Sequence, residues 1–357
     1  MAVPEPTVDK LEREKKINVI THADKQRPLF KCLFQSLAVF HWILMPSLCL
    51  CVFCLLCTIP PLWFITIPYV IWSLWIDDAP STGKRRSMWF RRLFLMRLMR
   101  NYFPITLERT VPLPADRPYL FGYHPHGIIG LGAVVSFGSE ACGIAQKLPG
   151  IVPRVLTLAS NFNMPLYREY LMLLGFGSVS RESCETLLSQ GPGSAILIVV
   201  GGAQESLNAR PGEMDLTLKN RKGFVRVAMR TGADLVPTIG FGENDIYKQA
   251  DNHEGSWLYS LQQHVKRLAG FTIPIIEGRG LFHASFGWMP YQRPINVIIG
   301  EPVQVTHTKE PTDEEVDAMH ERYVQALIKY VVCASNLTDF TKRIRTSCCP
   351  TGSTSCI

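Results

Sequence analysis

A long apolar stretch near the N-terminus dominates the pattern of hydrophobic and polar positions. Residues 32–76 contain no Asp, Glu, Lys or Arg. This length exceeds the roughly 20 residues that an apolar helix needs to cross a bilayer once. Pro60-Pro61 interrupts the stretch, and proline removes a backbone donor and clashes with the preceding helical turn. The pattern therefore predicts a membrane hairpin of two helices, at about 33–58 and 62–76, that folds back at the two prolines.

Basic residues flank this stretch on both sides. They are Lys25, Arg27 and Lys31 before it, and Lys84, Arg85, Arg86, Arg91 and Arg92 after it. Because cytosolic segments carry the excess of Lys and Arg, we expect both ends of the hairpin in the cytosol. The second arm is short for a span, so a shallow wedge in the membrane is the alternative. A cleaved signal peptide is disfavoured, because the stretch begins late, is too long and has no small-residue cleavage site.

The segments around the hairpin have different characters. Residues 1–31 read as a polar cytosolic arm, and residues 341–357 as a tail. Residues 77–104 mix arginines and lysines with large apolar side chains. This mixture predicts a basic interfacial helix, with apolar stems in the lipid and cations at the headgroups. An ordinary domain helix with a basic face is the alternative.

Residues 105–340 alternate short apolar runs with segments of helical periodicity. This alternation predicts an α/β domain in which helices flank a mixed, largely parallel sheet. The last helix is the best marked, because Thr312 and Glu315 fit a capping box. The expected strands are 119–123, 155–158, 195–200, 235–239 and 295–299, and the expected helices are 131–142, 165–174, 181–190, 222–231, 256–269 and 313–333.

Composition narrows the classes of partner. The net charge is +7, but the cations are not arranged as a nucleic-acid footprint, so we expect no nucleic acid. The 11 cysteines include no two CxxC pairs at the spacing of a zinc ribbon. We therefore expect reduced thiols in a protein that faces the cytosol, and no metal site.

Titratable residues follow two of the predicted strands. The segment 124–127, HPHG, comes directly after the first strand, and the segment 201–205, GGAQE, directly after the third. Ligands of open α/β sheets bind beyond the carboxyl ends of strands. Histidine beside a carboxylate is suited to removing a proton from a hydroxyl, because its pKa lies near neutrality. The spacing alone is compatible with acid–base chemistry, with a capped turn and with a metal-ligand pair, and it does not by itself bring His126 and Glu205 together.

These segments make the chain resemble the type-2 diacylglycerol acyltransferases, which include monoacylglycerol acyltransferases and wax synthases. The resemblance covers most of residues 30–335, and the sequences of several motif blocks look closest to those of fungal diacylglycerol acyltransferases. One tetrapeptide alone is a weak signal, whereas five blocks in order behind a hairpin are a strong one. The blocks are Tyr102-Phe103-Pro104, His124-Pro125-His126-Gly127, the PxxR of 165–168, the GGxxE of 201–205, and the RxGFxR of 221–226 that runs on to Val236-Pro237 and Phe241-Gly242.

The resemblance implies an endoplasmic-reticulum enzyme that also reaches lipid droplets and makes triacylglycerol from diacylglycerol and acyl-CoA. His126 would be the general base, with His124 in support, and Glu205 would orient the imidazole or stabilise its charge. No cofactor is expected, since acyl-CoA is a co-substrate, and no G-x-S-x-G elbow suggests a covalent acyl-enzyme. Glycines of the two loops would let backbone N–H groups reach the developing oxyanion; these are Gly127, Gly201 and Gly202.

The chain departs from the His-x-x-x-x-Asp pattern of the wider glycerolipid acyltransferases. Five residues after His124 stands Ile129, and five after His126 stands Leu131. The carboxylate that orients the base must therefore come from elsewhere in the chain, and Glu205 is our hypothesis.

Further residues of the blocks are candidate substrate contacts. Arg221, Lys222 and Arg226 open a predicted helix and are suited to the phosphates of CoA, with a solvated basic face as the alternative. Arg168 is either a substrate contact or a structural ion-pair partner. The block Tyr102-Phe103-Pro104 is either a binding element or a packing hinge between the interfacial helix and the domain.

Rival functions remain at this point. A monoacylglycerol acyltransferase or wax-ester synthase differs only in the acceptor, whose pocket the sequence does not reveal. A lipid-droplet hairpin protein without chemistry fits the hairpin but not the two loops, and a lipid hydrolase lacks its nucleophile elbow. The expected partners are acyl-CoA, diacylglycerol and membrane lipids. The sequence leaves the oligomeric state open, with a homo-oligomer among the alternatives.

Overall fold

The computed structural model describes residues 29–249, 264, 275–281 and 286–335 of the 357-residue chain. Most of the predicted N-terminal arm, nearly all of the predicted helix at 256–269 and the predicted tail at 341–357 lie outside the described residues.

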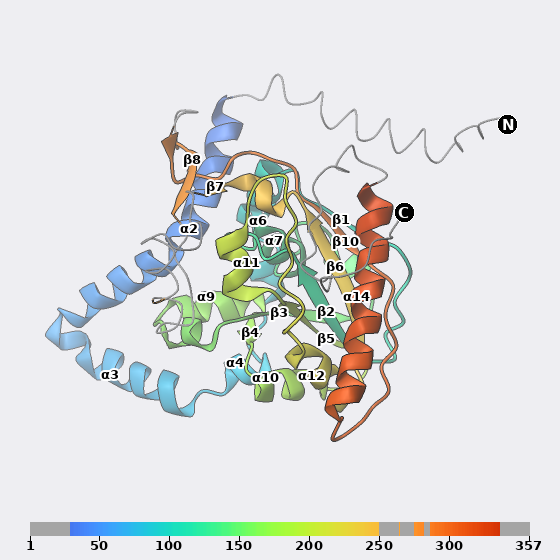
Figure 1. The fold of residues 1–357 in the computed structure, drawn as a ribbon. Coiled ribbons are helices and arrows are strands. Elements are labelled where there is room, and N and C mark those ends of the chain that lie inside the picture. The colour runs from blue at the N-terminus through green and yellow to red at the C-terminus, as the bar shows by residue number, and fades with distance from the viewer. Residues whose placement is uncertain (1–28, 250–263, 265–274, 282–285, 336–357) are drawn as a thin grey trace.

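A seven-stranded sheet forms the centre of the molecule, in the order β1-β10-β6-β2-β5-β3-β4 (Figure 1). The strands β6, β2, β5, β3 and β4 run parallel to one another, whereas β1 and β10 run antiparallel to them. The mixed, largely parallel sheet and all five expected strands are therefore confirmed. The bounds are β1 Thr106–Arg109, β2 Tyr119–His124, β3 Val152–Thr157, β4 Gly177–Ser178, β5 Ser194–Val199, β6 Asp234–Phe241 and β10 Asn296–Ile299.

Helices cover both faces of this sheet, because the central strand β2 is apolar on both sides. Its Tyr119, Phe121 and Tyr123 point into one hydrophobic core, and Leu120 points into the other. The first core is covered by α2 Leu29–Cys57, α6 Phe94–Tyr102, α7 Leu131–Phe137 and α9 Tyr167–Leu174. The second is covered by α10 Arg181–Leu188, α12 Gly223–Thr231 and α14 Asp313–Ser335.

Shorter elements connect these layers. A small antiparallel sheet is made of β7 Lys248–Gln249, β8 Ile276–Arg279 and β9 Phe286–Gly287. The remaining short helices are α8 Ile144–Lys147, η4 Ala159–Asn163, α11 Gly202–Asn208 and η5 Glu243–Ile246. The predicted capping box starts α14: the Thr312 N–H donates to Glu315 Oε2 over 2.9 Å, and the Glu315 N–H donates to Thr312 Oγ1 over 3.2 Å.

Two apolar arms extend from the domain and meet at Pro60-Pro61 (Figure 1). The first is α2, and the second is η2 Pro60–Leu62 followed by α3 Trp63–Ile71 and η3 Trp72–Ile76. Within the described part of the chain, one helix, Cys32–Cys57, is long and apolar enough to cross a membrane, and Pro60–Ile76 is shorter. Large apolar side chains of the second arm are strongly exposed, among them Phe64 and Trp75, each 74% exposed. The first arm is held where Ala38 and Val39 are buried in the core.

The predicted interfacial helix is divided into three short helices: α4 Ala79–Thr82, α5 Met88–Arg91 and α6. Arg91, which we expected at the lipid headgroups, is 1% exposed and donates to the carbonyls of Leu174 (2.5 Å) and Phe137 (2.8 Å). That expectation was wrong for Arg91, because its guanidinium satisfies buried carbonyl groups inside the domain. Trp89 and Phe94, at 74% and 67% exposure, keep an apolar outer surface here.

Candidate active site

The HPHG loop leaves the carboxyl end of β2 and turns at once into α7. Gly127 and Gly130 both have left-handed backbone conformations, with φ of +62° and +60°. A side chain at Gly127 would also come within 2.6 Å of the Glu243 side chain. Glycine is therefore required at this turn, both for its conformation and for the close approach.

His124 is fully buried behind the loop. Its Nε2 lies 2.9 Å from the Tyr323 hydroxyl, which donates to the Gly122 carbonyl over 3.2 Å. Because the Tyr323 hydroxyl donates its proton in a hydrogen bond to the carbonyl, it accepts a hydrogen bond from Nε2–H of His124. Burial lowers the pKa of His124 to about 3, so the ring is neutral. His124 thus joins β2 to α14 through Tyr323, and its supporting role in catalysis stays a prediction.

His126 lies in the loop that follows β2 and is half-buried. Its Nδ1 lies 2.9 Å from the Gly127 carbonyl and 2.7 Å from Ser206 Oγ, and Ser206 itself donates to the same carbonyl over 2.9 Å. A carbonyl only accepts, so Nδ1 carries the proton and Nε2 has a free lone pair. Burial lowers the pKa of His126, which favours this neutral form at pH 7. The ring is therefore prepared to accept a proton at Nε2.

The Glu205 side chain contacts the backbone of the HPHG loop. Its Oε2 accepts the His126 N–H over 2.9 Å, and its Oε1 accepts the Thr217 N–H over 2.7 Å. Burial raises its pKa, and the N–H groups of Thr217 and His126 and the charge of Arg221 lower it. The sequence placed Glu205 against the imidazole, whereas in the structure the contact is with the peptide of His126. Ser206, the next residue on α11, takes the place beside the ring.

Glu243 is a buried carboxyl that sequence reasoning missed. It follows β6, and its Oε2 accepts from the Tyr123 hydroxyl (2.8 Å) and the Gly132 N–H (2.9 Å). Its Oε1 has no hydrogen-bond partner within the described ranges. Burial raises its pKa to about 7, against lowering by the Tyr123 hydroxyl and backbone N–H groups. The rule that ligands gather at strand ends could have found it, since β6 pairs in parallel with β2.

The two glycines before Glu205 are needed for different reasons. A Cβ on Gly201 would overlap the Glu205 carboxyl, so the close approach of that carboxyl excludes any side chain. Gly202 has φ +60° with open space around its Cα, so only its conformation favours glycine. The role of these glycines in stabilising an oxyanion stays a prediction.

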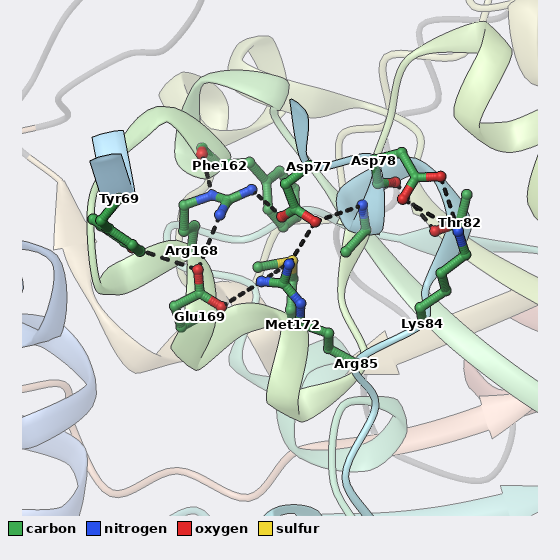
Figure 2. A network of polar contacts seen from close by, with 11 residues as sticks. Tyr69, Asp77, Asp78, Thr82, Lys84, Arg85, Phe162, Arg168, Glu169 and Met172 are labelled. Carbon is green, nitrogen blue, oxygen red and sulfur yellow. Dashed lines mark hydrogen bonds and ion pairs between the residues drawn. The ribbon is translucent and has the colours of Figure 1, made fainter. Parts of the chain in front are cut away.

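Arg168 lies in a closed ionic network, shown in Figure 2, and is only 1% exposed. Its Nη2 lies 2.5 Å from Asp77 Oδ2 and its Nη1 lies 2.9 Å from Glu169 Oε1. Arg85 bridges the same two carboxylates at 2.5 and 2.6 Å. The indole of Trp72, at the end of the second apolar arm, lies 4.6 and 5.6 Å from the two guanidinium carbons. These contacts favour the structural ion-pair alternative for Arg168, which connects the apolar arm to α9.

The two aromatic residues of the block 102–104 are interior as well, and Pro104 is half-buried. Tyr102 and Phe103 are fully buried with their ring centroids 4.6 Å apart. The Tyr102 hydroxyl donates to the Pro290 carbonyl (2.5 Å) and accepts from Arg279 Nε (2.8 Å). The structure places these rings and the adjoining Pro104 in the position of the packing hinge, which joins α6 to β1 and β8.

The basic residues around the start of α12 are distributed among several partners. Lys222 lies 2.5 Å from Asp317, and Arg226 lies 2.5 Å from Asp313, both on α14. Arg221 donates to the Gly201 carbonyl over 3.4 Å and is therefore beside the loop that carries Glu205. In the described part of the chain, no three His, Cys, Asp or Glu side chains gather as a metal site requires.

The Glu205→Gln variant should lower the melting temperature. Both carboxylate oxygens of Glu205 accept a backbone N–H, but glutamine offers one oxygen and turns its NH₂ group toward the second donor. An unsatisfied buried donor costs about 1–3 kcal/mol of unfolding free energy. Thermal unfolding of the purified protein in detergent measures the change, and an unaltered melting temperature would contradict the assigned contacts.

Glu243→Gln is the matched control, because one oxygen of Glu243 receives both hydrogen bonds and glutamine keeps them. In the wild type, the pKa of Glu243 rises from 4.5 unfolded to about 7 folded. The unfolded state therefore releases a proton that the folded state retains, and the contribution of Glu243 to stability is lost as the pH rises through this window. The melting temperature of Glu243→Gln should not show this loss of stability as the pH rises. A pH dependence equal to that of the wild type would contradict the raised pKa of Glu243.

Comparisons with known proteins agree on one family. The family model described as diacylglycerol acyltransferase matches residues 53–335. Diacylglycerol O-acyltransferase 2A of Umbelopsis ramanniana is 47% identical over 82% of this chain and 84% of its own. Diacylglycerol O-acyltransferase 1 of Schizosaccharomyces pombe is 46% identical over 82% and 85%, and diacylglycerol O-acyltransferase 2 of Homo sapiens is 44% identical over 83% and 77%.

A crystal structure of the 1-acyl-sn-glycerophosphate acyltransferase of Thermotoga maritima aligns with 80% of this chain and 97% of its own, at 12% identity and a TM-score of 0.36. The family model covers well over half of the chain, and the relatives named above exceed 40% identity over more than three quarters of both partners. The chain therefore belongs to the diacylglycerol acyltransferase family.

Proposed function

We propose that this protein transfers a fatty acyl group from acyl-CoA to the free hydroxyl of diacylglycerol, which yields triacylglycerol and CoA. Family membership supports the reaction class. The observation that carries the proposal is the contact of His126 Nδ1 with Gly127 and Ser206, because it leaves Nε2 as a base in the HPHG loop. A lipid-droplet protein without chemistry would have no use for such an arrangement.

The proposed mechanism is a direct transfer. Nε2 of His126 takes the proton of the acceptor hydroxyl while the hydroxyl oxygen attacks the thioester carbonyl. The tetrahedral oxyanion collapses, the C–S bond breaks, and the CoA sulfur receives the proton from His126. Ser206 and the Gly127 carbonyl hold Nδ1–H throughout, and Glu205 fixes the peptide that carries the ring. The thioester supplies the activated acyl group, so the proposed reaction uses no cofactor and no metal.

The protein is membrane-associated, and we propose the endoplasmic reticulum and the surface of lipid droplets as its locations. Burial of an acyl chain stabilises by about 0.8 kcal/mol per CH₂, so diacylglycerol and triacylglycerol stay in the lipid. The exposed apolar arms hold the domain at that surface, and acyl-CoA reaches it from the cytosol. Basic residues at both ends of the apolar segment support a cytosolic position for the catalytic domain.

A direct competition between acceptors tests the proposal. Purified protein with one acyl-CoA should prefer diacylglycerol over monoacylglycerol and a long-chain alcohol by at least about tenfold in kcat/KM. A preference for monoacylglycerol or the alcohol would assign the other acceptor within the family. Absence of transfer to all three acceptors, with folded protein, would overturn the proposal.

A further inference from the structure

A cavity of about 380 Å³ opens between α10 and α12, beside the carboxyl end of β5. Ile198, Phe224 and Val227 give it an apolar side. Among the described residues that line it, none is acidic, and four are arginines: Arg181, Arg221, Arg226 and Arg230. Such a cavity suits a ligand that is part apolar and part strongly anionic.

The arginines of the cavity are only partly neutralised by protein groups. Arg181 and Arg230 share one carboxylate, that of Glu185, at 2.9 and 3.4 Å. Arg226 pairs with Asp313 of α14. Arg221 donates to the Gly201 carbonyl and interacts electrostatically with Glu205. Four arginines thus face three carboxylates. The Nε of Arg230 is buried and has no hydrogen-bond partner within the described ranges. An excess of positive charge therefore remains at the cavity for a ligand.

The N-terminus of α12 adds to this field. Gly223, the first residue of this nine-residue helix, lines the cavity, so first-turn backbone N–H groups, which have no acceptor within the helix, lie beside the arginines. Helix N-termini favour phosphate, and the planar guanidinium binds phosphate oxygens in pairs. Both features favour an anionic group with several acceptor oxygens, such as phosphate.

We infer that this cavity binds the phosphorylated nucleotide head of acyl-CoA, with the base against Phe224 and Ile198 and the phosphates among the arginines. The inference rests on the proposed function. It adds Arg181 and Arg230, which no sequence block suggested, to the expected contacts of Arg221 and Arg226.

The path from the cavity to the reacting centre is short along the chain. Val200 lines the cavity, the carbonyl of the next residue accepts from Arg221, and α11 then carries Glu205 and Ser206 to His126. One short segment of the chain, residues 200–206, thus contacts both the cavity and His126.

An anionic lipid headgroup would offer the same phosphate chemistry from another source. Residues of α10 and α12 line the cavity, and these helices cover the same face of the sheet as α14, whereas α2 packs on the opposite face (Figure 1). This arrangement separates the arginines from the first apolar arm, whereas α4, which follows the second arm, contacts α10 through Ser81 and Ser183. The separation from the first arm favours a soluble ligand that arrives from the aqueous side.

The test uses the full chain in nanodiscs and the double variant Arg181→Gln/Arg230→Gln. CoA binding, measured by calorimetry without acceptor lipid, should weaken by about tenfold or more, the scale of lost charge-assisted hydrogen bonds. The KM for acyl-CoA should rise similarly, with kcat and melting temperature nearly unchanged. Arg322→Gln, at an exposed position of α14 outside the cavity, is the control and should bind CoA as the wild type does.

Unaltered CoA binding by the double variant would overturn the inference. The inference would also fail if the double variant bound CoA normally but bound phosphatidic acid in the nanodisc less tightly than the wild type does. The cavity would then hold a lipid headgroup. A wild type that binds CoA through these arginines but forms no triacylglycerol would contradict the proposed function and leave the cavity assignment standing.

Discussion

Replacing His126 with alanine is expected to lower kcat for acyl transfer by at least about a hundredfold, the contribution of a positioned proton acceptor. The residue is partly exposed, and its neighbours are held by other groups: Glu205 by Thr217 and Ser206 by the Gly127 carbonyl. The fold should therefore survive, and the KM for acyl-CoA should change little. Steady-state kinetics with diacylglycerol, together with a melting curve, measure both properties.

Ser206→Ala is the matched variant for this prediction. It leaves the imidazole but removes the hydroxyl 2.7 Å from Nδ1, so we expect a smaller fall in kcat, of about tenfold, from a less well-oriented ring. The pH dependence supplies a second check. Burial lowers the pKa of His126, so the wild-type rate should be flat near neutrality and fall as the pH drops through that lowered pKa. A His126→Ala variant with near wild-type kcat would exclude this residue as the base.

The fold was predictable where burial leaves a clear mark on the sequence. β2 is buried at all six positions, and its first five residues, 119–123, read as a run without charged side chains, as strands covered on both faces do. α14 was equally clear because its capping box and helical periodicity agree. β1 was missed, since its Thr-Leu-Glu-Arg sequence is that of a short, largely polar edge strand. Its place in the sheet is set by pairing with β10, which no local pattern encodes.

The candidate site was predictable at the level of loops but not of atoms. β2 and β5 are parallel neighbours, so the rule of strand ends correctly brings the HPHG and GGAQE segments together. Residues one apart on a helix diverge by about 100°, so the choice between Glu205 and Ser206 as partner of the ring depends on how α11 is docked. The rotation of α11 about its axis is set by tertiary packing, so it could not be predicted from the sequence. Arg168 was ambiguous for a related reason, because its partner Asp77 lies far away in the chain.

Replacing Arg168 with alanine is expected to destabilise the protein by about 3–5 kcal/mol, the cost of removing one partner from a buried ion pair. Asp77 is 6% exposed at its side chain and would lose a guanidinium, and the Phe162 carbonyl would lose the Nε–H donor 2.9 Å away. Arg85 remains on both carboxylates, so the network would be broken rather than abolished. Melting temperature in detergent, and limited proteolysis near the junction of η3 with α4, would report the loss.

Arg168→Lys separates charge from geometry. Lysine keeps the positive charge, but its single nitrogen cannot occupy the three positions from which Nε, Nη1 and Nη2 of Arg168 donate, so it should recover only part of the lost stability. Lys84→Ala provides the control in the same region: its ion pair with Asp78 is exposed, and such pairs contribute about 0–1 kcal/mol. If Arg168→Ala instead left the melting temperature intact and raised the KM for either substrate, Arg168 would be a substrate contact. The contacts favour the structural outcome. Nε, Nη1 and Nη2 of Arg168 each donate to a protein oxygen, and the guanidinium lies over the Trp72 ring.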